Sequence, residues 1–246
     1  MDKSHLQSVA MSGLFKYIDL KDHEQAWNEL NMAPHNYFAD EIVYHQDEKI
    51  VRAAIVHKGI VKGERIHAEG TSHLAYIYRR GESFAFEGAL SGRGTSPLQL
   101  TAQGDTTVIF FDVQNIFSST FEHALLTGLL EQLANDDIKK LYRIEILSRR
   151  SIRGRIMAHF KFLASRYGSN TFTLDMNREQ LAQYLCVNRS ALSNELNIMK
   201  REGIIDFDKR QFTLLSDQSH PVLFTDDGVV TKPIRPLNKE NFIKKI

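Results

Sequence analysis

Two short helical patterns separated by a three-residue turn, at residues 177–203, constrain the fold more than any other feature of this chain. Asn177 is a suitable N-cap for the first helix and Asn188 for the second, because a side-chain oxygen at this position accepts a bond from a free backbone N–H. Gly203 follows the second pattern, and glycine commonly ends a helix. The apolar residues recur at helical spacing, so we expect the two helices to cross and bury them: Leu181, Ala182, Leu185, Leu192, Leu196 and Met199.

The opposite face of the second predicted helix begins with polar side chains that can hydrogen-bond base edges and phosphates. They are Arg189, Ser190, Ser193 and Asn194. A helix-turn-helix inserts the N-terminal part of its second helix into the major groove, where such groups read bases. Residues 204–215 then have the pattern of two short strands around a charged turn, which is typical of a wing. The alternative is an ordinary helical hairpin with a polar surface.

The same stretch resembles the winged helix-turn-helix of the CRP/FNR (catabolite activator/fumarate-nitrate regulator) family of bacterial transcription regulators. The likeness is carried by Cys-Val-Asn-Arg-Ser-Ala-Leu-Ser-x-Glu-Leu from Cys186 and Met-Lys-Arg-Glu-Gly-Ile-Ile from Met199, and it extends more weakly over residues 13–215. The resemblance implies phosphate contacts by Arg178 and Asn188, and base contacts by Arg189, Ser190 and Asn194. Many members carry Arg, Glu and Arg at the base-contacting positions, so this chain is expected to prefer a different operator.

The distribution of charge agrees with a nucleic-acid-binding C-terminal half. Residues 143–213 hold 13 Lys and Arg against 7 Asp and Glu, whereas residues 1–142 hold 13 against 19. A basic module joined to an acidic one suits binding to a polyanion. No apolar run reaches the roughly 20 residues that span a membrane, and the single cysteine favours a reducing cytoplasm. No catalytic constellation or metal-ligand spacing stands out, so the sequence predicts neither an enzyme nor a cofactor.

The first half of the chain has the pattern of a small antiparallel barrel or jelly roll. Eight of the fourteen glycines lie between Gly59 and Gly104 and separate short β-rich runs. Residues 1–34 look helical and irregular, with Trp27 and Leu30 expected in the core. The resemblance implies the double-stranded β-helix of cyclic-nucleotide-binding domains. The predicted strands are residues 37–38, 42–44, 53–56, 60–61, 74–78 and 108–111.

The predicted barrel lacks the residues with which nucleotide-binding relatives hold a cyclic phosphate, namely a Gly-Glu-Leu turn and an Arg-Ser pair. Ala85-Phe86 stands near the first motif and Ser96-Pro97 near the second, with Arg93 as the substitute cation. We therefore predict a regulator that does not depend on cyclic AMP. An unidentified effector stays open as an alternative, with aromatic walls from Tyr76, Tyr78, Phe84 and Phe86.

Two other sensor types of the family are disfavoured. Iron–sulfur members need a cluster of cysteines, and the one cysteine here, Cys186, is expected to be a buried apolar residue of the turn. Haem members need axial ligands, and His57, His67 and His73 are the barrel histidines that we considered for this role.

A stripe of apolar residues at helical spacing predicts a long helix over residues 116–147. The resemblance implies that this helix pairs with its twin as a parallel coiled coil, and the alternative is that it packs wholly on its own barrel. After it, Ser151 is the expected N-cap of a helix over residues 152–166, and the arginines of residues 148–155 are either phosphate contacts or a solvated linker. The predicted dimer contacts are Leu126, Leu129, Leu130, Leu133, Leu141 and Ile144.

The sequence therefore predicts an α+β fold in three parts. They are a cyclic-nucleotide-binding-like β jelly roll (residues 1–114), a dimerisation helix (115–148) and a winged helix-turn-helix (149–218), with an extension of unassigned role (219–246). The predicted partners are double-stranded DNA, a second copy of the chain and RNA polymerase. A further alternative is a barrel protein that uses its helix-turn-helix for protein contact.

Overall fold

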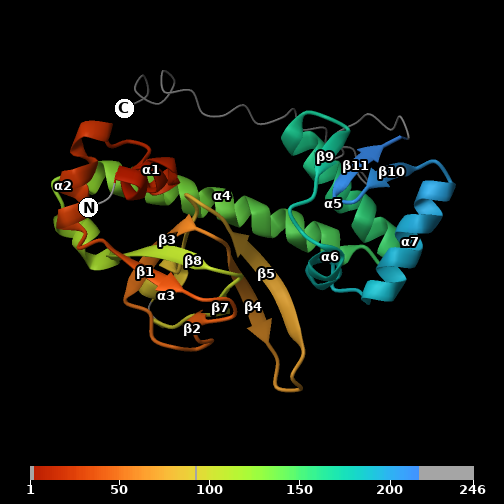
Figure 1. Ribbon diagram of the computed structural model, residues 1–246, viewed down its shortest axis with the longest axis horizontal. Helices are drawn as coiled ribbons and strands as arrows, with labels where there is room; N and C mark the ends of the chain where they lie inside the picture. Colours follow the sequence, from red (N-terminus) through yellow and green to blue (C-terminus); the bar gives the residue numbers. More distant parts are fainter. Residues whose placement is uncertain (1–2, 92, 216–246) are drawn as a thin grey trace.

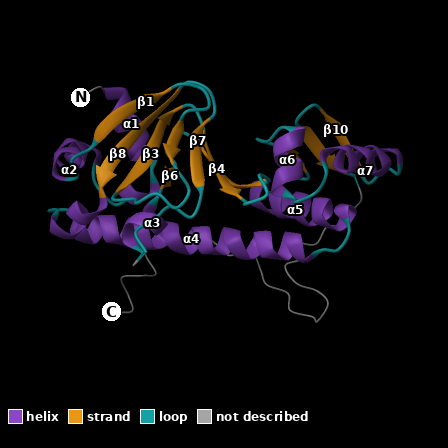
Figure 2. Ribbon diagram, turned by 90° about the horizontal axis from the view of Figure 1, so that it is seen from below, coloured by secondary structure: helices purple, strands orange, loops and turns teal. Residues whose placement is uncertain are grey.

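The computed structural model describes residues 3–91 and 93–215, so the extension over residues 219–246 lies outside the described residues. One long helix, α4 (Glu122–Ser148), runs beside an antiparallel β domain and continues to a smaller domain, here called the reader (residues 152–215) (Figure 1). Seen from below, α4 lies along one side of the molecule, with the sheets and the reader on its other side (Figure 2). The predicted α+β fold and the order of its parts are confirmed.

Eight strands build two four-stranded antiparallel sheets in the barrel domain. One sheet has the order β1-β8-β3-β6 and the other the order β2-β7-β4-β5, which is the two-sheet arrangement of a jelly roll. Ile55 and Ile109 face each other across β3 and β8, and both are fully buried. The strands are β1 (Ala33–Tyr37), β2 (Ile42–Tyr44), β3 (Arg52–Lys58), β4 (Val61–Ile66), β5 (Ser72–Tyr78), β6 (Ser83–Phe84), β7 (Gln99–Ala102) and β8 (Thr106–Asp112).

Strand β7 was not predicted, because side chains on both of its faces are buried. It lies between β2 and β4 in its sheet. Thr101 is buried together with its neighbours Leu100 and Ala102, so the alternation that marks a half-exposed strand is missing. The two-residue β6 and the short helix α3 (Phe86–Leu90) were also not predicted. The predicted strand at residues 37–38 is wrong at Phe38, which lies outside β1 and is exposed.

Four short helices precede the barrel and cover the beginning of α4. Trp27 and Leu30 are buried among them, as expected. Gly128 allows this close packing, because a Cβ at this position would lie 2.5 Å from the carbonyl oxygen of Leu14. The four helices are α1 (Lys3–Met11), η1 (Gly13–Phe15), η2 (Leu20–Asp22) and α2 (His23–Glu29).

The prediction that the long helix begins near residue 116 is wrong. A separate 3-10 helix, η3 (Val113–Ser118), precedes α4, which begins at Glu122. The carboxylate of Glu29 fixes this break, because it accepts the Ser119 hydroxyl at 2.6 Å and the Thr120 N–H at 2.9 Å. These bonds, the Ser119 hydroxyl first, lower the pKa of Glu29 to about 2. A carboxylate from a distant helix therefore determines where α4 starts.

The reader packs three helices against a three-stranded sheet of order β10-β11-β9. Its core includes Phe160, whose ring centroid lies 5.4 Å from that of Phe172 and 4.8 Å from that of Phe212. The predicted cap at Ser151 is confirmed, since its hydroxyl accepts the N–H of Gly154 at 3.0 Å. The elements are α5 (Ile152–Tyr167), β9 (Thr171–Thr173), α6 (Arg178–Tyr184), α7 (Arg189–Arg201), β10 (Ile205–Asp208) and β11 (Gln211–Leu214), so the predicted wing is also confirmed.

Candidate nucleic-acid interface

Both helices of the predicted helix-turn-helix are capped as expected. Asn177 and Gln180 form a reciprocal capping box at the start of α6, with side-chain to backbone bonds of 2.8 and 2.9 Å. The side-chain oxygen of Asn188 accepts the N–H of Ser190 at 2.9 Å at the start of α7. Gly203 follows α7 with a φ of +69°. The six apolar residues predicted between the two helices are all buried, so the local fold is confirmed.

The turn between α6 and α7 depends on a residue in the left-handed conformation. Cys186 has a φ of +52°, and a non-glycine residue in this region carries strain of roughly 1 kcal/mol. Its side chain is half-buried, so the expectation of a buried apolar cysteine is wrong. The backbone geometry of the turn, rather than core packing, sets the environment of this residue.

The face of α7 expected to contact bases is open to solvent. Arg189, Ser190 and Asn194 are exposed and Ser193 is half-buried beside them. The Nε of Arg189 lies 3.6 Å from the carboxylate of Glu179, an exposed ion pair that solvent weakens. A guanidinium held this loosely can exchange its partner for the acceptor edge of a guanine.

The two predicted phosphate contacts lie in different settings. The guanidinium of Arg178 lies over the wing, 4.7 Å from the ring centroid of Phe207 and 4.8 Å from that of Phe212, and burial lowers the pKa of Arg178. The oxygen of Asn188 is engaged in the cap of α7, which leaves its amide NH₂ as the group that can meet a phosphate. Arg178 therefore couples the start of α6 to the wing.

Two arginines of the expected hinge hold the reader together instead of lying in a solvated linker. The Nε of Arg153 pairs with Glu195 at 2.5 Å, and its Nη1 pairs with Glu202 at 2.8 Å. The Nη1 of Arg155 donates to the carbonyls of Leu185 and Cys186, each at 3.0 Å. These roles could not be predicted from the sequence, because the partners of the two arginines are distant acidic residues and the backbone of a turn.

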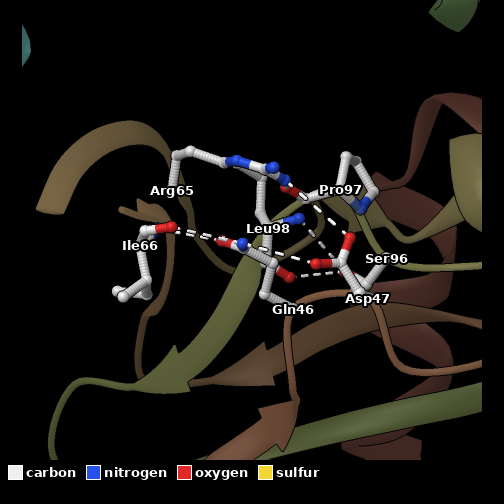
Figure 3. Close-up of polar contacts among 7 residues, drawn as sticks. All are labelled: Gln46, Asp47, Arg65, Ile66, Ser96, Pro97 and Leu98. Carbon is white, nitrogen blue, oxygen red and sulfur yellow. Dashed lines mark hydrogen bonds and ion pairs between the residues drawn. The ribbon is translucent and has the colours of Figure 1, made fainter. Parts of the chain in front are cut away.

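The loop at residues 81–97 is here called the cassette loop, and Ser96 and Pro97 near its end are bonded to neighbouring segments of the barrel (Figure 3). Ser96 is buried, and its hydroxyl donates to the carbonyl of Leu98 at 2.5 Å. The N–H of Ser96 donates to the carbonyl of Glu48, and proline at position 97 has no N–H. Arg65 donates to the carbonyl of Pro97 at 2.8 Å. Ser96 and Pro97 therefore offer an anion neither a free hydroxyl nor a free N–H.

The other half of the cassette loop is part of the core. Ala85 precedes α3 with a φ of +71°, and Phe86 is buried with its ring 5.6 Å from that of Phe111. Phe84 is likewise buried, 5.2 Å from Tyr78. Of the four aromatic residues considered as effector walls, Tyr76 and Tyr78 alone line a cavity of about 470 Å³ between β5, α4 and α5.

The barrel histidines considered as haem ligands are not part of a metal cluster. The rings of His67 and His73 lie 4.9 Å apart, whereas His57 Nδ1 hydrogen-bonds the hydroxyl of Ser8 at 2.9 Å. Over residues 3–91 and 93–215, no group of three or more His, Cys, Asp or Glu side chains could hold a metal ion. Over the same residues, no helix is long and apolar enough to cross a membrane.

Helix α4 carries an uncovered apolar face. Its large apolar side chains are 40 to 67% exposed at positions whose spacings of eight, three and three residues place them on one side of the helix: Leu130, Ile138, Leu141 and Ile144. Leu129, predicted as a dimer contact, is buried in the barrel core instead, because the turn that contains it packs on η1. Leu126 and Leu133 are partly buried against the same core.

These observations define the class of protein: a winged helix-turn-helix joined by a long helix to a jelly-roll domain. Two family models match the chain in the same order, the cyclic nucleotide-binding domain over residues 34–121 and the Crp-like helix-turn-helix domain over residues 154–218. The chain belongs to the CRP/FNR family, and it is a transcription regulator with a helix-turn-helix DNA-binding domain.

Individual relatives are distant. Electron transport regulator A of Shewanella oneidensis is 20% identical over 182 residues, which cover 72% of each chain. A CooA mutant from Carboxydothermus hydrogenoformans is similar in structure, with a TM-score of 0.65, 20% identity, and coverage of 78% of this chain and 86% of that one. FixK2 from Bradyrhizobium japonicum has a TM-score of 0.57 at 20% identity, covering 76% and 94%. At these identities the structural likeness establishes the fold.

Proposed function

We propose that this regulator binds a near-palindromic operator as a homodimer, and that it does so without a cyclic nucleotide. One recognition helix α7 would enter the major groove of each half-site, with the half-sites about 34 Å apart. The observation that carries the proposal is the position of Arg189, Ser190 and Asn194 on an open face of a helix whose other face is buried. With this target the protein would act in the bacterial cytoplasm, as a regulator and not as an enzyme.

Dimerisation is supported by the uncovered face of α4. Leu130, Leu141 and Ile144 are 67, 59 and 64% exposed in the single chain, and a parallel pairing of two α4 helices would bury all three on both copies. Removing large apolar side chains from water favours association. Pairing along α4 would also give the two readers the two-fold symmetry that a palindromic operator requires.

Independence from cyclic nucleotides is supported by the cassette loop. A cyclic phosphate buried without donors or a paired cation carries an uncompensated desolvation penalty. The Ser96 hydroxyl is bonded to Leu98, and Phe86, which stands near the position where the resemblance implies an acidic residue, is buried in the core. Arg93 lies exposed on the loop. These groups do not provide the donor set that such an anion needs.

The proposal is tested by selecting duplexes from a random library and measuring their retardation by the purified protein without any nucleotide. We expect an enriched sequence with two inverted half-sites, bound by a dimer, and an affinity that falls steeply with salt because phosphate contacts release counterions. Enrichment of no sequence, together with an affinity that does not respond to salt, would favour use of the helix-turn-helix for protein contact. The predicted contact with RNA polymerase is not tested by this experiment.

A further inference from the structure

Arg143 of α4 hydrogen-bonds the backbone at the edge of the barrel. Among the described residues, strand β5 is an edge strand that pairs with β4, and the register of this pair slips by one residue at Ala75, a β-bulge. The Nη1 of Arg143 donates to the carbonyl of Ala75 at 2.6 Å, and its Nη2 donates to the carbonyl of Leu74 at 2.7 Å. The planar guanidinium thus binds two successive carbonyls that the bulge presents at the free edge of the sheet.

The same guanidinium contacts the reader. Its carbon lies 4.5 Å from the centroid of the Tyr184 ring at the end of α6, and its Nη2 is 3.5 Å from the Tyr184 carbonyl. The Tyr184 ring also contacts that of His159 in α5, at 5.0 Å between ring centroids. Arg143 therefore belongs to three parts of the molecule at once: the long helix by its backbone, the barrel by two hydrogen bonds, and the reader by a cation–π contact.

Two further polar contacts lie along the seam between the barrel and the reader. The Nη2 of Arg79 donates to the carbonyl of Asp175 at 3.1 Å, and the side-chain NH₂ of Gln180 donates to the side-chain oxygen of Gln103 at 3.0 Å. The first contact joins the residue after β5 to the segment before α6, and the second joins the residue after β7 to α6 itself. The exposed face of α7 with Arg189 and Asn194 takes no part in them.

We infer that Arg143 is a positioning residue for DNA binding, which fixes the reader against β5 in an orientation that leaves the base-reading face of α7 open. This inference rests on the proposed operator binding. It explains how each chain of the dimer keeps its reader in a fixed orientation without a bound effector. Two readers bind two half-sites together more tightly when each already has a fixed position relative to α4, because less freedom is lost on binding. Lysine cannot replace the arginine fully, since an ammonium does not bind two adjacent carbonyls as a fork does.

The test compares Arg143→Gln with Lys139→Gln as the matched control. Lys139 lies on the same helix, and its substitution removes the same charge, but it forms an ion pair with Asp136 of its own helix. We expect Arg143→Gln to weaken binding to the selected operator about tenfold or more, Arg143→Lys to be intermediate, and the control to match the wild type. Sedimentation and thermal unfolding check that each variant is a folded dimer.

Varying the spacing between the two half-sites distinguishes a positioning role of Arg143 from a general role in stability. The wild type should lose most of its affinity when two base pairs are inserted between the half-sites. A reader released from the seam should tolerate the insertion, so the ratio of affinities for the two duplexes should fall for Arg143→Gln. A folded, dimeric Arg143→Gln with the wild-type operator affinity and the wild-type ratio would overturn the inference. If Arg143→Gln does not fold, Arg143→Lys is held to the same two criteria.

The rate of cleavage by trypsin measures the mobility of the reader without DNA. Arg149 and Arg150 are exposed between α4 and α5, and a reader that moves freely should make this segment easier to cleave. We expect cleavage there to be faster in Arg143→Gln than in the wild type and in Lys139→Gln, each of which is compared without DNA. Equal rates in all three would contradict the inference even if operator binding itself were absent, so the two failures can be told apart.

Discussion

Two places in this molecule have the residue types that bind an anion, and they use their polar groups in opposite ways. At the start of α7, the oxygen of Asn188 satisfies the helix end, and Arg189 and Asn194 are left exposed. In the cassette loop, Ser96 directs its hydroxyl and its N–H to the carbonyls of Leu98 and Glu48. An anion site needs donors that are free or loosely held, as Arg189 and Asn194 are in the reader, whereas the donors of Ser96 are bonded within the barrel domain.

The largest effect is expected from disrupting the dimer on which the reader depends. Ile144→Asp places a charge on the uncovered face of α4, where burial without a partner is costly. Sedimentation should report a monomer, and operator affinity should fall by about 100-fold or more, because two linked half-sites bind far more tightly than one. Asn135→Asp adds the same charge to an exposed position on another side of α4 and should leave the dimer intact. A dimeric Ile144→Asp protein would refute this pairing.

The reader and the barrel should also differ in their response to acid. His159 is buried and lacks a hydrogen-bond partner on either ring nitrogen within the described part of the chain. Burial, with a smaller effect of Arg143, lowers the pKa of His159 from 6.5 to about 4. Between these values the unfolded chain binds a proton that the folded chain does not, so folding free energy of roughly 3 kcal/mol is lost as pH falls from 6.5 to 4.

This loss should appear as earlier unfolding of the reader. Circular dichroism follows all helices, whereas the fluorescence of Trp27, the one tryptophan, follows the barrel domain. We expect the two unfolding curves to separate as pH falls, and His159→Phe to remove the separation. Coincident curves at pH 5 for the wild type would show that His159 does not limit the stability of the reader.

A smaller effect should distinguish the two kinds of DNA contact within the reader. Arg189→Ala should cost about 1–3 kcal/mol on the selected operator and relax the preference at one base pair per half-site. Arg178→Ala should weaken binding to specific and random duplexes alike and lower the salt slope by about one, with some loss of stability because its guanidinium lies on Phe207. A repeated selection with Arg189→Ala that returns the wild-type sequence would reject the base contact.

The smallest effect concerns a backbone feature that both regions share. Ala85 in the cassette loop and Cys186 in the helix-turn-helix have φ values of +71° and +52°, a region that glycine adopts without strain. Ala85→Gly and Cys186→Gly should each raise the free energy of unfolding by up to about 1 kcal/mol. Chemical denaturation of both variants measures this change, and a loss of stability would show that the Cβ contacts outweigh the backbone strain.

The sequence predicted the reader almost completely, because its signals are local. Asn177, Asn188 and Gly203 mark helix ends through bonds to residues two to four positions away, and these predictions are confirmed. The features that were missed depend on distant partners: Glu29 sets the start of α4, and Arg143 binds carbonyls of β5. Leu129 was misplaced because a periodic stripe does not tell which of its residues face the barrel.

The central claim is that Ser96 and Pro97 offer a cyclic phosphate no free donor, so that the protein binds its operator without a cyclic nucleotide. The most direct measurement is calorimetric titration with cyclic AMP and cyclic GMP at millimolar concentration, paired with operator binding in the presence and absence of each. We predict no saturable heat and one operator affinity under all conditions. Saturable binding that also raises operator affinity would contradict the account and make Arg93 the expected partner of the phosphate.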